Sequence, residues 1–139
     1  MIGDLRPVDV VMYVFYLVLL AVAAVAATRN VLWLVPLALS VACAALWFVA
    51  RWQLGAAFSV QPEAHHLVAT GLYARIRHPI YIFGTAAFLL VLLALLGWQG
   101  LAIWAILIPV QLVRAGREEH VLAEAFGVEY ESYRRSTWF

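Results

Sequence analysis

One polar segment, "RIRHPIYIFG" at residues 75–84, places two arginines and a histidine directly before a proline and a long apolar run. Proline is favoured at the first position of a helix, so we expect His78 to be the N-cap and Pro79 the first helical residue. Tyr81 follows three residues after His78 and can share its face. The free N–H groups of such a helix start, with arginines beside them, can bind a small anion. The alternative is a basic membrane anchor with an interfacial tyrosine, which leaves the His-Pro-x-Tyr order unexplained.

Two further segments carry polar groups. In "RAGREE" at 114–119, Arg114 and Glu118 are four residues apart and can face the same direction, either as a site or as an ordinary surface ion pair. In "HHLVATGLY" at 65–73, a glycine permits a backbone turn. The two adjacent histidines of this segment do not share a helix face, and no second pair has ligand spacing, so we predict no metal site.

The composition indicates the kind of structure that holds these polar residues. Of 139 residues, 66% are hydrophobic and 12% charged, which is typical of an integral membrane protein. The sequence has no basic run with interleaved aromatic residues, so it does not indicate nucleic-acid binding. Cys43 is predicted to be a small buried residue. We predict an all-α integral membrane protein with about four transmembrane helices, at residues 8–27, 31–50, 80–96 and 101–113.

The chain is predicted to form a single domain, 1–139, with two N-terminal spans in 1–50 and a catalytic core in 51–139. The N-terminal run is too long for a signal peptide and is predicted to be retained. The tail is predicted to form amphipathic helix ending at Gly127 and a second short helix at 129–135.

The four residues "GWQG" at 97–100 leave room only for a turn, so the last two spans should form a tight antiparallel hairpin. That hairpin brings the start of the third span, with His78 and Tyr81, to the end of the fourth, with Arg114 and Glu118. The resulting pocket contains cations, a carboxylate, a phenol and a helix N-terminus. Such a pocket suits a zwitterionic cofactor next to a lipophilic substrate.

The arginines predict the orientation. With four spans, the N-terminus, the middle linker and the tail share one side, which holds eight of the nine arginines, whereas the other side holds only Arg29. The positive-inside rule therefore places both termini in the cytoplasm. A short, lysine-free, alanine-rich chain indicates a bacterial inner membrane.

The segments "HHLVATGLYARIRHPIYIFG" and "RAGREEHVLAEAFGVEYESY" resemble the isoprenylcysteine carboxyl methyltransferase family, which is related to the phospholipid N-methyltransferases. These are membrane enzymes that use S-adenosylmethionine and release S-adenosylhomocysteine. The resemblance covers residues 65–133, about half of the chain. It implies cofactor contacts at His65, His66, Leu67, Val68, Gly71, Tyr73, His78, Pro79, Ile80, Tyr81 and Glu118. It implies that Arg114 faces the substrate and that Arg114 and Glu118 are the catalytic residues. A glutamine ahead of the cofactor segment also contacts the cofactor in relatives, and Gln61 is a candidate at a different spacing.

The resemblance implies methyl transfer to a lipophilic acceptor in the membrane. Carboxyl O-methylation of an isoprenylcysteine-like or other lipophilic acid is favoured, because Arg114 suits a carboxylate. Phospholipid or amine N-methylation is the alternative within the same enzyme class. A non-catalytic membrane subunit remains open, and cofactor binding would argue against it. A small transporter is disfavoured because Asp9, near one end, is the one ionisable residue in the predicted spans.

Overall fold

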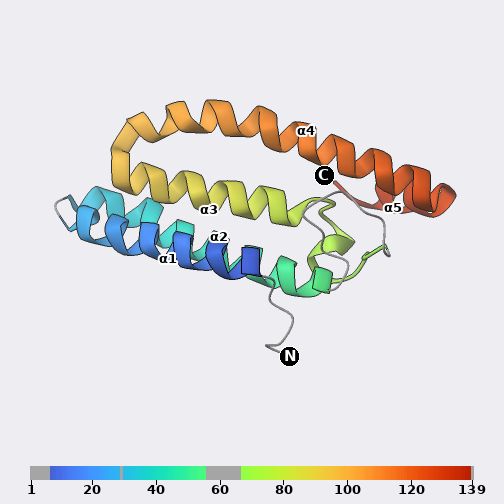
Figure 1. The fold of residues 1–139 in the computed structure, drawn as a ribbon, viewed down its shortest axis with the longest axis horizontal. Coiled ribbons are helices and arrows are strands. Elements are labelled where there is room, and N and C mark those ends of the chain that lie inside the picture. The colour runs from blue at the N-terminus through green and yellow to red at the C-terminus, as the bar shows by residue number, and fades with distance from the viewer. Residues whose placement is uncertain (1–6, 29, 56–66, 139) are drawn as a thin grey trace.

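The computed structural model describes residues 7–28, 30–55 and 67–138, and the regular secondary structure of this part of the chain is all helical (Figure 1). The α-helices are α1 (Pro7–Ala27), α2 (Leu34–Leu54), α3 (Pro79–Leu96), α4 (Gly100–Phe126) and α5 (Val128–Ser136). Short 3-10 turns are η1 (Val31–Trp33), η3 (Gly71–Ala74) and η4 (Gly97–Gln99).

Three segments of the described chain are long and apolar enough to cross a membrane: Val10–Ala27, Val31–Leu54 and Pro79–Phe126. The third contains both arms of a hairpin, α3 and α4, joined by η4. Most large apolar side chains on these helices point outward, as expected where lipid replaces water. The predicted all-α membrane fold is therefore confirmed. Cys43, predicted to be buried, is only partly buried on α2.

The hairpin turn depends on two glycines. Gly97 ends α3 with a φ of +61°, and its N–H bonds to the carbonyl of Leu93. Gly100 begins α4 so close to α3 that a Cβ atom there would lie 2.9 Å from the carbonyl oxygen of Leu92. Because only glycine fits such an approach, α4 can turn back along α3 within three residues (Figure 1). The predicted tight hairpin is confirmed.

Helix α3 is central and contacts α1, α2 and α4. Its buried apolar residues include Val91 and Ala94, which pack with Ala23 of α1. A hydrogen bond also joins α2 to α3, because Ser40 Oγ of α2 donates to the carbonyl of Ala87 at 2.7 Å. Tyr16 Oη of α1 lies 2.6 Å from the same hydroxyl. These satisfied polar groups tie three helices together and fix the position of α3.

Helix α4 extends well beyond the apolar run that predicted it. Pro109 lies within the helix without ending it, and α4 continues to Phe126. Gly127, with a φ of +50°, then donates its N–H to the carbonyl of Ala123 and ends the helix, as predicted. The short helix α5 follows directly. Figure 1 shows the end of α4 and α5 at the same end of the molecule as the start of α3.

Candidate functional site

The start of α3 has the predicted geometry: His78 is the N-cap and Pro79 is the first helical residue. The His78 side chain does not cap its own helix. Instead, its Nε2 atom lies 3.1 Å from Oε1 of Glu119, and its Nδ1 atom lies 3.8 Å from Oε2 of Glu118. One imidazole therefore links the start of α3 to two adjacent carboxylates of α4.

These polar groups are largely shielded from solvent. The side chain of His78 is 12% exposed and that of Glu119 is 27% exposed. Arg77 approaches Glu119 from the loop before α3, with 3.6 Å between Nε and Oε1. Partial burial strengthens such interactions relative to surface ion pairs. The loop and both arms of the hairpin thus meet at one charged centre.

The next turn of each helix adds an aromatic ring and a cation. The ring of Tyr81 lies 5.8 Å from that of His78, and the guanidinium carbon of Arg114 lies 5.5 Å from the centre of the Tyr81 ring. This distance is within the range of a cation–π interaction. Arg114 is exposed, whereas Tyr81 is partly buried. Arg114 therefore lies at the outer edge of the site. We call His78, Tyr81, Arg114, Glu118 and Glu119 the hairpin-mouth cluster.

The loop before α3 is held by a glutamine that was not predicted from the sequence. Gln53, in the last turn of α2, accepts a hydrogen bond from the backbone N–H of Leu72 at 2.8 Å. Gly71 makes this approach possible, because a Cβ there would lie 2.5 Å from the Gln53 side chain. The glutamine precedes the loop by 19 residues, so no local pattern marks it.

The structure describes some of the other predicted cofactor residues but not all of them. Leu67 and Val68 are partly buried and Tyr73 is buried. Pro79 is fully buried and Ile80 is partly buried. His65, His66 and Gln61 lie outside the described residues.

The C-terminal segment packs against the loop before α3. Tyr133 of α5 donates its hydroxyl to the carbonyl of Tyr73 at 2.8 Å, and the backbone N–H of Trp138 donates to the carbonyl of Arg75 at 2.9 Å. Tyr130 and Tyr133 are both buried. From the sequence these tyrosines could be assigned only to a tail helix, since the carbonyl that Tyr133 contacts lies 60 residues away in the chain.

Burial controls the charge of these phenols. It raises the pKa of Tyr130 to about 12, helped mainly by the negative charge of Glu119. Burial and the neighbouring Tyr130 raise the pKa of Tyr133 to about 12. Burial and the carboxylate of Glu118 raise the pKa of Tyr73 above its usual range. All three phenols are therefore neutral at physiological pH and can donate hydrogen bonds.

Comparison with known protein families matches residues 32–129 to the family described as phospholipid methyltransferase. The match spans more than half of the chain and includes α2, the Gly71 loop and the whole hairpin-mouth cluster. The chain belongs to this family. Its members are membrane methyltransferases that use S-adenosylmethionine, and the family implies a lipid acceptor. The comparisons with curated proteins and with solved structures give no match.

The residues present fit the cofactor of this family. Two buried phenol oxygens, Tyr73 Oη and Tyr130 Oη, have no hydrogen-bond partner among the described residues. The first N–H groups of α3 have no partner within their own helix. S-adenosylmethionine carries ribose hydroxyls, a carboxylate and an ammonium group, which pair with such donors and with the nearby glutamates. Unpaired buried polar groups are costly, so a polar ligand here would stabilise the site.

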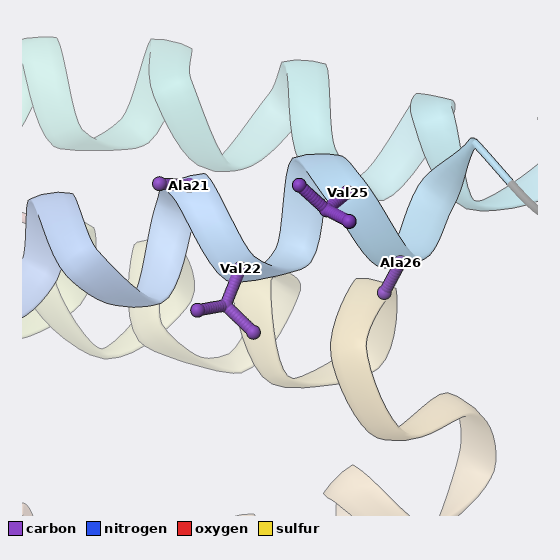
Figure 2. Close-up of a pocket in the computed structure, with 4 residues that line it drawn as sticks. All are labelled: Ala21, Val22, Val25 and Ala26. Atoms are coloured by element: carbon purple, nitrogen blue, oxygen red, sulfur yellow. The ribbon is translucent and has the colours of Figure 1, made fainter.

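A shallow hollow on α1 is a poor candidate for the cofactor site. It is lined by Ala21, Val22, Val25 and Ala26 and presents no polar side chain (Figure 2). It lies near the C-terminal end of α1, where the contact between Trp33 and Trp98 marks the closed end of the hairpin. The hairpin-mouth cluster lies at the opposite end of α3 and is the better candidate for the cofactor site.

We expect substitution of Gly71 by alanine to destabilise the loop and weaken cofactor binding. Its φ of +61° costs an alanine about 1–2 kcal/mol, and the new Cβ would displace Gln53. Gly116 is the matched control, because it lies in α4 without a positive φ, and a Cβ added there would meet no atom within 4 Å. In detergent, Gly71→Ala should lower the unfolding temperature, whereas Gly116→Ala should not. Equal behaviour of the two variants would contradict the role of Gly71.

Proposed function

We propose that the hairpin-mouth cluster binds S-adenosylmethionine and that the protein methylates the carboxylate of a lipophilic acid in the membrane. The position of Arg114 carries this proposal. Its guanidinium lies over Tyr81 at the exposed edge of the cluster, within the helix that crosses the bilayer. A guanidinium grips a carboxylate with two parallel hydrogen bonds, which fixes the plane of the acceptor.

The cofactor contacts are assigned from the family resemblance and the geometry. The start of α3, from His78 to Tyr81, suits the methionine carboxylate because its free N–H groups point out of the helix. Leu67, Val68 and Tyr73 suit the adenosine, and Glu118 suits the cationic groups. His65 and His66 are further proposed contacts from the resemblance, as is the turn at Gly71.

The chain's own residues have mainly a positioning role. S-adenosylmethionine supplies a methyl group that is already activated by a positively charged sulfur. Arg114 orients a carboxylate acceptor, which is ionised at neutral pH and needs no general base. The buried tyrosines from the loop and from α5 exclude water from the cluster. No nucleophilic side chain is required for such a transfer.

A second candidate is N-methylation of a phospholipid amine, which the family description favours. In that case Arg114 would hold the phosphate of the lipid and the adjacent carboxylates Glu118 and Glu119 would face the amine. Both candidates place an anionic group of the lipid on Arg114. They differ in which atom of the acceptor receives the methyl group.

The chemical stability of the product separates the two candidates. Membranes containing the protein are incubated with S-adenosylmethionine labelled on the methyl group, and the lipids are then extracted and treated with mild base. Carboxyl methylation gives a methyl ester that base hydrolyses to volatile labelled methanol. Label that stays non-volatile after base treatment, including label on a water-soluble headgroup released by deacylation, would overturn the carboxylate proposal in favour of the amine.

We also propose that the polar cluster faces the cytoplasm, as the arginine distribution predicts. Single cysteines at Trp98 and at Ser132, in a Cys43→Ser background, test this orientation. A membrane-impermeant thiol reagent added to intact cells should label the cysteine at 98, in the hairpin turn, but not the cysteine at 132, in α5. Labelling of both positions from the same side would contradict the topology.

A further inference from the structure

A polar pair lies deeper in the hairpin than the cluster. Gln111 of α4 donates from Nε2 to Oγ1 of Thr85 on α3, at 3.4 Å. The other polar atom of this amide, Oε1, is buried and has no hydrogen-bond partner among the described residues. Thr85 lies one turn beyond Tyr81, and Gln111 lies one turn before Arg114.

The ordinary role of such a pair is to join two helices within the membrane. A bond of 3.4 Å between two uncharged groups is long for that purpose. It also leaves the carbonyl oxygen of Gln111 unsatisfied in a segment that crosses the membrane, where water cannot compensate. A leucine at this position would avoid that cost. The pair therefore suits a ligand that completes its hydrogen bonds.

The position of the pair indicates which part of a ligand reaches it. At a rise of about 1.5 Å per residue, Gln111 lies about 4.5 Å from Arg114 along α4, towards the closed end of the hairpin. An acceptor held by its anionic head at Arg114, with its tail in the bilayer, passes Gln111 immediately after the head. The pair thus meets the group that joins head to tail.

We propose that Gln111 and Thr85 form a subsite for this linking group and select lipophilic acids whose head is joined to the tail through an amide. The inference rests on the proposed carboxylate acceptor. The free oxygen of Gln111 needs a donor, which an amide N–H supplies and a plain alkyl chain does not. The amide carbonyl in turn accepts from the Thr85 hydroxyl or from the Gln111 amide. An amide suits either orientation of the Gln111 side chain, since it both donates and accepts.

Binding of two matched acids tests this subsite. An N-acylglycine and a straight-chain fatty acid of equal length are titrated into detergent-solubilised protein saturated with S-adenosylhomocysteine. We expect the wild-type protein to bind the N-acylglycine about tenfold more tightly, as one or two added hydrogen bonds allow. Gln111→Met, which keeps the length of the side chain, should remove most of this preference. Thr85→Val should reduce it.

The control is Gln99→Met, the same chemical change in the turn at the closed end of the hairpin. It should leave the preference intact. No preference in the wild-type protein, or a preference that survives in Gln111→Met, would overturn the subsite. Thermal unfolding of the same variants tests for a merely structural role. In that case the substitutions would lower the unfolding temperature and weaken the binding of both acids equally. The binding assay does not need turnover, so failure of the proposed methylation would show separately, as absence of a labelled ester with either acid.

Discussion

Arg114→Lys should lower turnover about a hundredfold while the affinity for S-adenosylhomocysteine stays nearly unchanged. Lysine keeps the positive charge but loses the planar pair of donors that fixes a carboxylate. Misplacing an acceptor by about 1 Å can cost a hundredfold in rate when the transfer depends on alignment. The measurement pairs initial rates of labelled methyl transfer with titration of the product cofactor. Because Arg114 lies at the exposed edge of the cluster, the substitution should not disturb the fold.

Arg117→Lys is the matched control for this prediction. Arg117 is exposed on the same helix, close to Arg114 in the chain, and it is not part of the hairpin-mouth cluster. Its replacement should leave turnover within about twofold of the wild-type value, as expected for a surface position. A similar loss in both variants would show that the effect is not specific to position 114 and would contradict the proposed grip of Arg114 on the acceptor. A large loss of S-adenosylhomocysteine affinity in Arg114→Lys would indicate that Arg114 binds the cofactor and not the acceptor.

The sequence predicted the hairpin because its signals are local. The four residues between two apolar runs allow only a turn, and the His-Pro pair marks a helix start that the structure confirms. The predicted meeting of His78 with the end of α4 then follows from the hairpin alone. The predicted fourth span ends at 113, where the apolar run ends, and the helix itself continues beyond it. An apolar run stops at the first charge, whereas the backbone hydrogen bonds of α4 continue to Phe126.

The supporting residues could not be predicted in the same way. Gln53 is 19 residues from the loop that it holds, and Tyr133 is 60 residues from the carbonyl to which it donates. These contacts depend on how the loop and α5 pack at the hairpin mouth, and neither segment has a pattern that specifies its partner. Glu119 illustrates the same limit. No role was assigned to it from the sequence, yet its carboxylate is the one closest to His78.

Glu118→Gln should weaken binding of S-adenosylhomocysteine about tenfold to a hundredfold. A hydrogen bond to a charged group is worth about 1.5–3 kcal/mol, which corresponds to this range. Glu118 lies beside His78 at the start of α3 and its charge acts on Tyr73, Tyr130 and Tyr133, so it is central to the proposed cofactor site. Glutamine keeps the shape and removes the charge that pairs with the cofactor's ammonium group. Titration calorimetry in detergent measures the change directly.

His78→Ala should weaken the same binding and also lower the thermal stability, because it removes the link between α3 and Glu119. Glu124→Gln serves as the control, since Glu124 is 69% exposed and pairs only with the exposed His120 along α4 in the described structure. It should change neither affinity nor unfolding temperature. Unchanged affinity in both Glu118→Gln and His78→Ala would refute a cofactor site at the hairpin mouth. The charged groups there would then serve only to join α3 to α4 and to anchor the hairpin at the membrane surface.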